Sequence, residues 1–285
     1  MQQVAVVGAS GRMGSWFTSY FARRGFDVST FDIHQKLSIS LDNVKMKKSL
    51  RDCVKDADLV LVSVPQEKTA QCIKECSKNM KRGSIITEIS SIKNKTFAAL
   101  KKVPLTIHPV CIHPMFGPGA SLEMRAKVLL IPVRSKRTEL KIANEIFEKA
   151  AITVLHDARD HDKLIAIVLG LTYFTNIVFA KVIASSNISM LKQVSGTTFG
   201  LQSIIAESIL TDEPELISAL MQANVYTKRY INRYLKEAAS IADLALAKDS
   251  KDLNAKMQET KARMERWQNL KQSYKRMYDI TENLH

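Results

Sequence analysis

The stretch VAVVGASGRMG, residues 4–14, runs from a short apolar segment directly into three glycines spaced three apart, and a helical pattern follows. A strand, a glycine-rich turn and a helix in this order are typical of a dinucleotide-binding βαβ unit. In such a unit Gly8 would make the tight turn, Gly11 would let the backbone approach a pyrophosphate, and Gly14 would let the helix pack on the strand. Amides at the helix start would hold the phosphates. A purely structural turn without a ligand is the alternative.

An acidic residue, Asp32, ends the second apolar run at about the distance from the glycines at which a carboxylate binds the ribose hydroxyls. Because such a carboxylate repels a 2′-phosphate, the sequence favours NAD over NADP, although Arg12, His34 and Lys36 are basic neighbours that could tolerate a phosphate. The small-residue turn of Ser63, Val64 and Pro65 ends the third predicted strand, and it either lines the nicotinamide side of the crevice or is structural. The candidate cofactor-binding residues are Gly8, Ser10, Gly11, Arg12, Met13, Gly14, Asp32, Ser63, Val64 and Pro65.

Strand-like runs alternate with amphipathic helical stretches over the first half of the chain, which predicts an α/β fold of the Rossmann type, with a doubly wound, mostly parallel sheet. The predicted strands cover residues 4–7, 28–31, 59–64, 85–88, 105–108, 128–133 and 152–155. The predicted helices cover residues 12–24, 50–55, 68–80, 93–101 and 136–150.

From about Asp160 the pattern changes to long helical periodicity without a convincing strand. The expected domains are therefore a dinucleotide-binding domain at 1–156 and an all-helical domain at 157–285, with helices near 164–188, 201–210, 214–247 and 253–284. The helix at 164–188 is apolar nearly all round, which predicts burial. A small helical domain can cover such a helix most easily by dimerising, so a homodimer is expected.

Composition narrows the class of protein further. No apolar run is expected to reach the roughly 20 residues that span a bilayer, and the first strand begins too near Met1 for a signal peptide, so a cytoplasmic protein without a membrane partner is expected. The net charge of +14 comes from basic residues interleaved with acids, which favours a solvated helical surface over a nucleic-acid site. The four cysteines lack a paired C-x-x-C spacing, so reduced thiols and no metal site are expected.

Two further segments carry candidate chemistry. In IHPMFGPGA, residues 112–120, His113 precedes a proline on an expected glycine-rich loop, and EISSIK covers residues 88–93. Both segments are expected at the carboxyl ends of strands, where open α/β sheets bind ligands. The unperturbed pKa of histidine near 6.5 suits a neutral proton acceptor, whereas the earlier His108 before Pro109 is read as a turn residue.

With these residues in place, the chain resembles the prephenate and arogenate dehydrogenases of tyrosine biosynthesis. The resemblance covers most of the length: the glycine-rich turn, Ser-x-Lys ending at Lys93, His-Pro-Met-Phe-Gly-Pro, the pair His161-Asp162, and a helical dimerisation domain. His-Pro-Met-Phe-Gly-Pro is the most specific of these motifs. For His161 and Asp162, a structural role as a helix-start cap and charge pair is favoured.

The resemblance implies oxidative decarboxylation of a cyclohexadienyl ring, with NAD as hydride acceptor and the active site between the two domains. It assigns the base to His113, which would take the hydroxyl proton, and it places Ser91 beside the same hydroxyl. The implied catalytic residues are His113 and Ser91, and the implied substrate-binding residues are Ser91, His113, Gly117, Thr172 and Tyr173.

Two positions depart from the family pattern. Tyr173 stands where the family commonly has a histidine, and Gly200 stands where an arginine usually clamps the substrate carboxylate. A missing guanidinium removes a bidentate anchor. Arg229, Lys228, Arg233 or a residue of a partner subunit could substitute, and the stretch 196–200 could form a mobile loop.

Two other functions remain open from the sequence. A related hydroxyacid or imine oxidoreductase would use a lysine on the long helix after the sheet, and Lys181 is the one lysine in its most apolar part. A nucleotide-sensing or nucleic-acid-binding protein without catalysis would fit the positive charge and the absent arginine.

Overall fold

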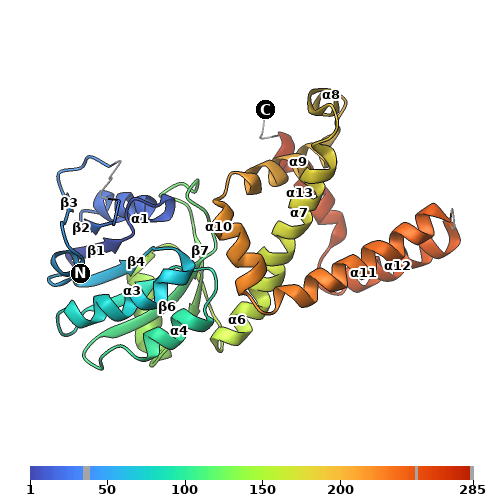
Figure 1. The fold of residues 1–285 in the computed structure, drawn as a ribbon. Helices are drawn as coiled ribbons and strands as arrows, with labels where there is room; N and C mark the ends of the chain where they lie inside the picture. The colour runs from blue at the N-terminus through green and yellow to red at the C-terminus, as the bar shows by residue number, and fades with distance from the viewer. Residues whose placement is uncertain (35–38, 248–249, 283–285) are drawn as a thin grey trace. The chain divides into compact units, whose positions relative to one another are not determined.

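The computed structural model describes residues 1–34, 39–247 and 250–282. The chain forms two compact units, Met1–Ile165 and Ala166–His285 (Figure 1). The division falls inside the helical stretch that begins at Ala158. The domain boundary expected after residue 156 stays a prediction.

The first unit is built on one eight-stranded sheet with the strand order β3-β2-β1-β4-β5-β6-β7-β8. Neighbouring strands are parallel except for β6 and β7, which confirms the expected mostly parallel, doubly wound α/β sheet. The strands are β1 Gln3–Val7, β2 Asp27–Phe31, β3 Val44–Met46, β4 Leu59–Val62, β5 Ile85–Glu88, β6 His108–Pro114, β7 Lys127–Ile131 and β8 Ala151–Val154.

Two strand predictions were wrong. The expected strand at 105–108 is instead a turn with Leu105 88% exposed, and β6 begins at His108 and runs through His113 to Pro114. Pro109 and Pro114 led to this strand being missed. Proline has no backbone N–H to donate to a neighbouring strand, so a proline in a sequence argues against a central strand. The short strand β3 was also missed, since its three residues carry no strong apolar pattern.

Helices cover both faces of this sheet (Figure 1). Side chains of α1 and α5 form one core with alternate residues of the strands, and α2, α3 and α4 form the other core. Such burial on both faces explains why the central strands read as continuous apolar runs. The helices are α1 Arg12–Arg23, α2 Leu50–Val54, α3 Gln66–Asn79, α4 Asn94–Lys101, α5 Lys136–Ile146 and α6 Ala158–Ile165.

The second unit is helical throughout its described residues, as expected. The predicted helix at 214–247 is broken, and the predicted helix at 253–284 is two helices; Leu284 lies outside the described residues. The elements are the π-helix η1 Ala166–Leu171, α7 Thr172–Ile183, α8 Ile188–Gln193, α9 Thr197–Leu210, α10 Pro214–Ser218, the π-helix η2 Ala219–Ala223, α11 Thr227–Leu246, α12 Ser250–Glu265 and α13 Leu270–Glu282.

The long apolar helix of the second unit is not buried within a single chain, so its expected burial by dimerisation stays a prediction. Asn176 is the buried residue of α7, whereas Val178 is 40% and Val182 67% exposed. The continuous helical stretch Ala158–Ile183 is long and apolar enough to cross a membrane by length and composition, although no such run was expected. That test is weak for a single helix, and buried helices of soluble proteins also pass it.

The four cysteines are free thiols, and Cys53, Cys76 and Cys111 are buried. Burial raises the pKa of the Cys53 thiol to about 12. These thiols are therefore packing residues of the sheet unit, in line with the sequence prediction.

Candidate active site

The glycine turn joins β1 to α1 in the geometry that its sequence predicts. Gly8 has a φ of 89°, and a Cβ there would lie 2.3 Å from the carbonyl oxygen of Ser63. A Cβ on Gly14 would lie 2.0 Å from the carbonyl oxygen of Gly8. At Gly11, however, the nearest atom would be 3.4 Å away, an ordinary contact. The protein's own packing therefore accounts for two of the three glycines, and the open space beside Gly11 fits the approach of a ligand.

The start of α1 lies at the point where the strand connections change direction. β1 and β4 are neighbours, α1 packs on one face of the sheet, and α3 packs on the other. In the described chain, α1 has Gly11 at its N-cap, no side chain that caps it and no acid in its first turn. Such an N-terminus suits the phosphates of a dinucleotide, which bind at this switch point in doubly wound sheets.

The turn after β4 lies against the glycine turn. The amide of Ser63 donates to the carbonyl oxygen of Val7 at 2.8 Å, and Pro65 is the N-cap of α3. Thr69 donates its hydroxyl to the carbonyl oxygens of Val64 and Pro65. The structure therefore brings together the two turns that the sequence analysis named as cofactor-binding candidates.

Asp32 follows β2 and fixes the neighbouring backbone. Its two carboxylate oxygens accept hydrogen bonds from the amides of Ser10 and His34, each at 3.0 Å. Each oxygen retains a second lone pair, so this carboxylate can still accept from ribose hydroxyls. Of the other candidates, Met13 packs against the adjoining core and Arg12 is exposed, whereas Lys36 lies outside the described residues.

A buried ion pair lies beneath the carboxyl ends of β5 and β6. Glu88 and Lys93 have fully buried side chains, and the Lys93 Nζ lies 2.6 Å from the Glu88 Oε1. Lys93 also donates to the carbonyl oxygen of Ile112. Removing either partner would leave an uncompensated charge in the interior, which is strongly unfavourable. This pair was not predicted from the sequence, although a glutamate that ends an apolar strand five residues before a lysine was a signal for it.

The loop between β5 and α4 is held by its first serine. Ser90 donates its amide and its hydroxyl to the Glu88 carboxylate. The side chain of Gln66 brackets Ile92, accepting from its amide and donating to its carbonyl oxygen. Ser91 is half-buried and makes no side-chain hydrogen bond among the described residues. Its predicted contact with a substrate hydroxyl stays a prediction.

His113 is the sixth residue of β6 and its side chain is buried, so the expectation of a loop histidine was wrong. Its Nδ1 lies 3.0 Å from the Nε2 of His161, whose own Nδ1 lies 2.9 Å from the Oδ1 of Asp162. In the described chain nothing hydrogen-bonds to the Nε2 of His113, and this atom is not among the fully buried polar atoms without a partner. It therefore keeps access to solvent.

His113 and His161 are neutral at physiological pH. Burial, the positive charge of Lys93 and the neighbouring His161 hold the pKa of His113 well below 6.5. Burial also lowers the pKa of His161, although the hydrogen bond to Asp162 opposes that shift. A neutral imidazole has one nitrogen that can accept a proton, so His113 is available as a base.

Asp162 links this chain of side chains to a second helix. Its carboxylate accepts the amides of Lys93 at 2.8 Å and Asn94 at 3.1 Å, and so caps the start of α4. The structural interpretation of the pair is met in both parts, since His161 and Asp162 form the expected pair and Asp162 caps a helix start, but that helix is α4 and not α6. Asp157 caps the start of α6, where its Oδ1 accepts the amide of Asp160.

The loop after β6 is anchored on the glycine-turn helix. Phe116 packs against Trp16, with ring centroids 4.8 Å apart, and Trp16 donates its indole N–H to the carbonyl oxygen of Ala120 at 2.8 Å. Gly117 is exposed, and a Cβ there would meet no atom within 4 Å. Neither backbone strain nor packing within the chain demands glycine at this position.

The predicted substrate-binding residues of the helical unit make their contacts within that unit. Tyr173 donates its hydroxyl to the Oδ2 of Asp212 at 2.6 Å, and Thr172 is exposed on the same helix. Gly200 lies in the first turn of α9, where a Cβ would meet open space. The stretch 196–200 is thus the N-cap and first turn of a helix, and the mobile-loop interpretation was wrong. Four basic candidates are exposed: Lys181, Lys228, Arg229 and Arg233.

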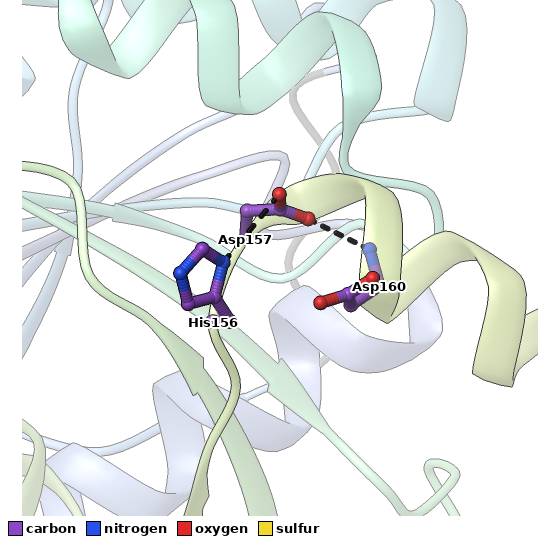
Figure 2. Close-up of side chains that lie close together, drawn as sticks. All are labelled: His156, Asp157 and Asp160. Carbon is purple, nitrogen blue, oxygen red and sulfur yellow. Dashed lines mark hydrogen bonds and ion pairs between the residues drawn. The ribbon is translucent and has the colours of Figure 1, made fainter.

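One surface cluster has the composition of a metal site. His156, Asp157 and Asp160 present ligand atoms within 4.8 Å of one another at the start of α6 (Figure 2). The His156 side chain is 88% exposed, and the Asp157 carboxylate is already engaged as the helix cap. Amides of the first turn lower the pKa of Asp157. Helix capping accounts for this cluster.

The fold and this site define a two-part protein with a dinucleotide-binding sheet followed by a helical unit. A sequence model of the prephenate dehydrogenase nucleotide-binding domain matches residues 22–155, and one of the prephenate dehydrogenase dimerization domain matches residues 157–259. The chain belongs to the prephenate dehydrogenase family.

Individual relatives agree with this assignment. The "Probable arogenate/prephenate dehydrogenase" of Methanocaldococcus jannaschii is 26% identical over 86% of this chain, and the "T-protein" of Haemophilus influenzae is 20% identical over 78%. This chain spans 57% and 56% of the lengths of those two proteins.

Solved structures show the same fold. A prephenate dehydrogenase from Aquifex aeolicus, in complex with hydroxyphenyl propionate and NAD+, has a TM-score of 0.71 at 22% identity, covering 93% of this chain and 98% of its own. The Synechocystis arogenate dehydrogenase has a TM-score of 0.66 at 15% identity, covering 94% of this chain and 100% of its own.

Proposed function

We propose that the chain is a nicotinamide-dependent dehydrogenase that converts prephenate to 4-hydroxyphenylpyruvate, or arogenate to tyrosine, by oxidative decarboxylation. The observation that carries the proposal is the neutral His113, at the end of a strand in the sheet that holds the glycine turn. One of its ring nitrogens is hydrogen-bonded to His161, and the other has no partner among the described residues. The name of one curated relative, the "Probable arogenate/prephenate dehydrogenase" of Methanocaldococcus jannaschii, supports the same reaction class.

In this reaction the chain's residues position the ring and accept its hydroxyl proton. Nε2 of His113 takes that proton as the carbonyl develops, and Ser91 contacts the same hydroxyl. A nicotinamide held at the glycine turn would supply the hydride acceptor for the carbon that bears the hydroxyl. Loss of carbon dioxide then gives an aromatic ring, which supplies the driving force. Positioning of the two reactants contributes the rest of the rate enhancement.

We infer NAD as the preferred cofactor and a homodimer as the working assembly. Asp32 is held beside the glycine turn by two backbone amides, where its charge would repel a 2′-phosphate. The dimerization-domain match and the exposed apolar residues of α7 support the dimer. No nucleic-acid or membrane partner and a cytoplasmic location are part of the same proposal.

The substrate carboxylate needs a cation, because Gly200 supplies none and its Cβ direction is empty. The exposed Lys228, Arg229 and Arg233 of α11, or a residue of a second copy, are the candidates within this proposal. Gly117, Thr172 and Tyr173 complete the proposed substrate-binding set.

Initial rates of reduced-nicotinamide formation test the proposal, with prephenate and arogenate each supplied with NAD+ and NADP+. His113→Ala is expected to lower kcat by roughly 10²- to 10⁴-fold, the usual contribution of a general base. The matched control is His108→Ala, which changes the exposed first residue of the same strand and should leave kcat unchanged. Absence of turnover with both substrates and both cofactors would refute the substrate assignment.

The cofactor preference has its own test. Asp32→Asn is expected to raise kcat/KM with NADP+ relative to NAD+ by roughly tenfold, because a charge that repels a phosphate is removed. An unchanged ratio would contradict the assignment of Asp32 to the ribose.

A further inference from the structure

We propose that His161 and Asp162 are positioning residues that fix the proton of His113 on Nδ1, so that Nε2 is the atom that receives the hydroxyl proton of the ligand. The inference deepens the proposed function and rests on it. It assigns a role to two residues whose sequence favours a structural explanation.

The argument begins at Asp162, which can only accept hydrogen bonds as a carboxylate. The amides of Lys93 and Asn94 both donate to its two oxygens, and its side chain is 5% exposed. The His161 Nδ1 lies 2.9 Å from its Oδ1. His161 must therefore carry its proton on Nδ1 to make this bond.

The second step concerns the other nitrogen of His161. The side chain is fully buried, and burial keeps its pKa below 6.5, so the ring is neutral at pH 7. With the proton on Nδ1, the Nε2 has only a lone pair. Because the Nδ1 of His113 lies 3.0 Å from that lone pair, His113 must donate there.

The third step gives the reactive atom. His113 is also neutral, so a proton on Nδ1 leaves Nε2 as an acceptor. During the proposed reaction the O–H bond of the ligand breaks and an N–H bond forms at Nε2, while the hydride of the same carbon leaves for the nicotinamide. His113 becomes an imidazolium, and the hydrogen bonds through His161 connect its charge to the Asp162 carboxylate.

The charges around His113 show why a hydrogen-bonded link to the Asp162 carboxylate would stabilise its imidazolium form. Lys93 lies near His113 and opposes a positive charge on it, while the Lys93 ammonium is paired with Glu88. The thiol of Cys111 also contacts the Glu88 carboxylate. Glu88 forms its ion pair with Lys93, whereas Asp162 is the carboxylate that is linked to His113 by hydrogen bonds through His161.

The alternative is a purely structural role for His161 and Asp162. Asp162 caps α4 from α6, and His161 could simply fill the space between them. The chain holds a built-in comparison in His156 and Asp157, the same residue pair five positions earlier. Its side chains are 88% and 40% exposed, with 3.6 Å between Nδ1 and Oδ2.

Nitrogen-15 NMR of histidine-labelled protein tests the tautomer without turnover. The wild-type chain is expected to show His113 with a protonated Nδ1 and an unprotonated Nε2, assigned by loss of the signal in His113→Gln. In Asp162→Asn, the fixed tautomers of both rings are expected to be lost. The opposite tautomer of His113 in the wild-type chain would overturn the inference, even if the chain proves inactive with both ring substrates.

Kinetics test the consequence in the active enzyme. His161→Leu removes the acceptor and is expected to lower kcat by roughly 10²-fold with KM changed less than about twofold. His161→Gln can present a carbonyl oxygen near the same point and should recover at least about tenfold of that loss. The control is His156→Leu, which should behave as the wild type.

The outcomes separate the two proposals. Turnover that depends on His113 but is unaffected by His161→Leu would overturn the positioning role and leave the proposed function standing. Equal losses in His161→Leu and His161→Gln, with the wild-type tautomer of His113 preserved in both, would assign His161 to packing alone. If His161→Leu does not fold, His161→Gln and Asp162→Asn give the same decision through kcat and the ring-nitrogen signals.

Discussion

The two units of the chain differ in how completely they bury their side chains. The sheet unit encloses charged and polar groups, among them Glu88, Lys93, His113, His161 and Asp162, in a connected set of hydrogen bonds. The helical unit leaves many large apolar side chains exposed. One unit has thus completed its interior within a single chain, whereas the other has not.

The difference lies in what each architecture can cover. A sheet with helices on both faces shields two cores and the polar ends of its strands from water. Helices such as α7 present apolar residues on more sides than one neighbour can cover. Contiguous exposed apolar surface marks an interaction site, which agrees with the dimerization-domain match. The sheet unit therefore carries precise polar geometry, and the helical unit exposes the apolar surface that the proposed dimer would bury.

Breaking the buried ion pair should have the largest effect on stability. Lys93→Met leaves Glu88 charged and unpaired, and we expect the sheet unit to lose roughly 3–5 kcal/mol. The chain has one tryptophan per unit, so a Trp267→Phe background leaves Trp16 as the fluorescent reporter of the sheet unit during denaturant unfolding. The double variant Lys93→Met with Glu88→Gln should recover part of the loss. A loss below about 1 kcal/mol in Lys93→Met would contradict the burial argument.

Placing a charge on the exposed apolar helix should affect association instead. Val182→Glu is expected to raise the dissociation constant of the proposed dimer at least roughly tenfold, because a buried, unpaired carboxylate is costly at an interface. Sedimentation velocity measures the change. Leu105→Glu is the matched control, since Leu105 is also exposed but lies in the sheet unit. Equal behaviour of the two variants would argue against an interface at α7.

Acid should destabilise the sheet unit selectively. Folded His113 and His161 have pKa values below 6.5, so as the pH falls below 6.5 the unfolded chain binds protons that the folded chain does not. Stability is therefore intact above that pH and declines below it, by up to about 1.4 kcal/mol per pH unit for each histidine.

The helical unit provides the internal control for this effect, because residues 166–282 contain no histidine. Unfolding followed through Trp16 should become easier between pH 7.5 and 5.5, and unfolding followed through Trp267 should change less. A sheet unit equally stable at both pH values would show that the buried histidines are not held neutral.

The smallest effect on stability is expected at Gly200, where a Cβ would meet open space. Gly200→Ala should stabilise α9 by roughly 0.5–1 kcal/mol, since alanine favours a helix and the new Cβ meets nothing within 4 Å. Gly170→Ala is the contrasting change, because its Cβ would lie 2.7 Å from the Oγ1 of Thr227. Thermal unfolding followed through Trp267 compares the two. Stabilisation by Gly170→Ala would contradict the close packing there.

Much of the sheet unit follows from local sequence. The glycine turn and the apolar strands were predicted correctly because their signals are the spacing of glycines and short apolar runs. Strand β6 was not predicted, because Pro109 and Pro114 argue against a strand in the local sequence, whereas its pairing depends on the neighbouring strands β5 and β7. The helical unit was predicted as helical, but periodicity gives the apolar face of a helix and not what covers it, so burial by a second copy stays a prediction.

The candidate site shows the same limit at the level of single residues. The motif around His113 indicated a proton acceptor from sequence alone, since histidine is the residue whose ordinary pKa suits that task. That His161 lies 3.0 Å away, with Asp162 behind it, depends on α6 packing against the start of α4, and no local pattern encodes that contact. Residue type thus determined which chemistry is available, whereas the tertiary structure decided which nitrogen of His113 is left to perform it, because a hydrogen bond fixes a tautomer only between groups that folding has brought together.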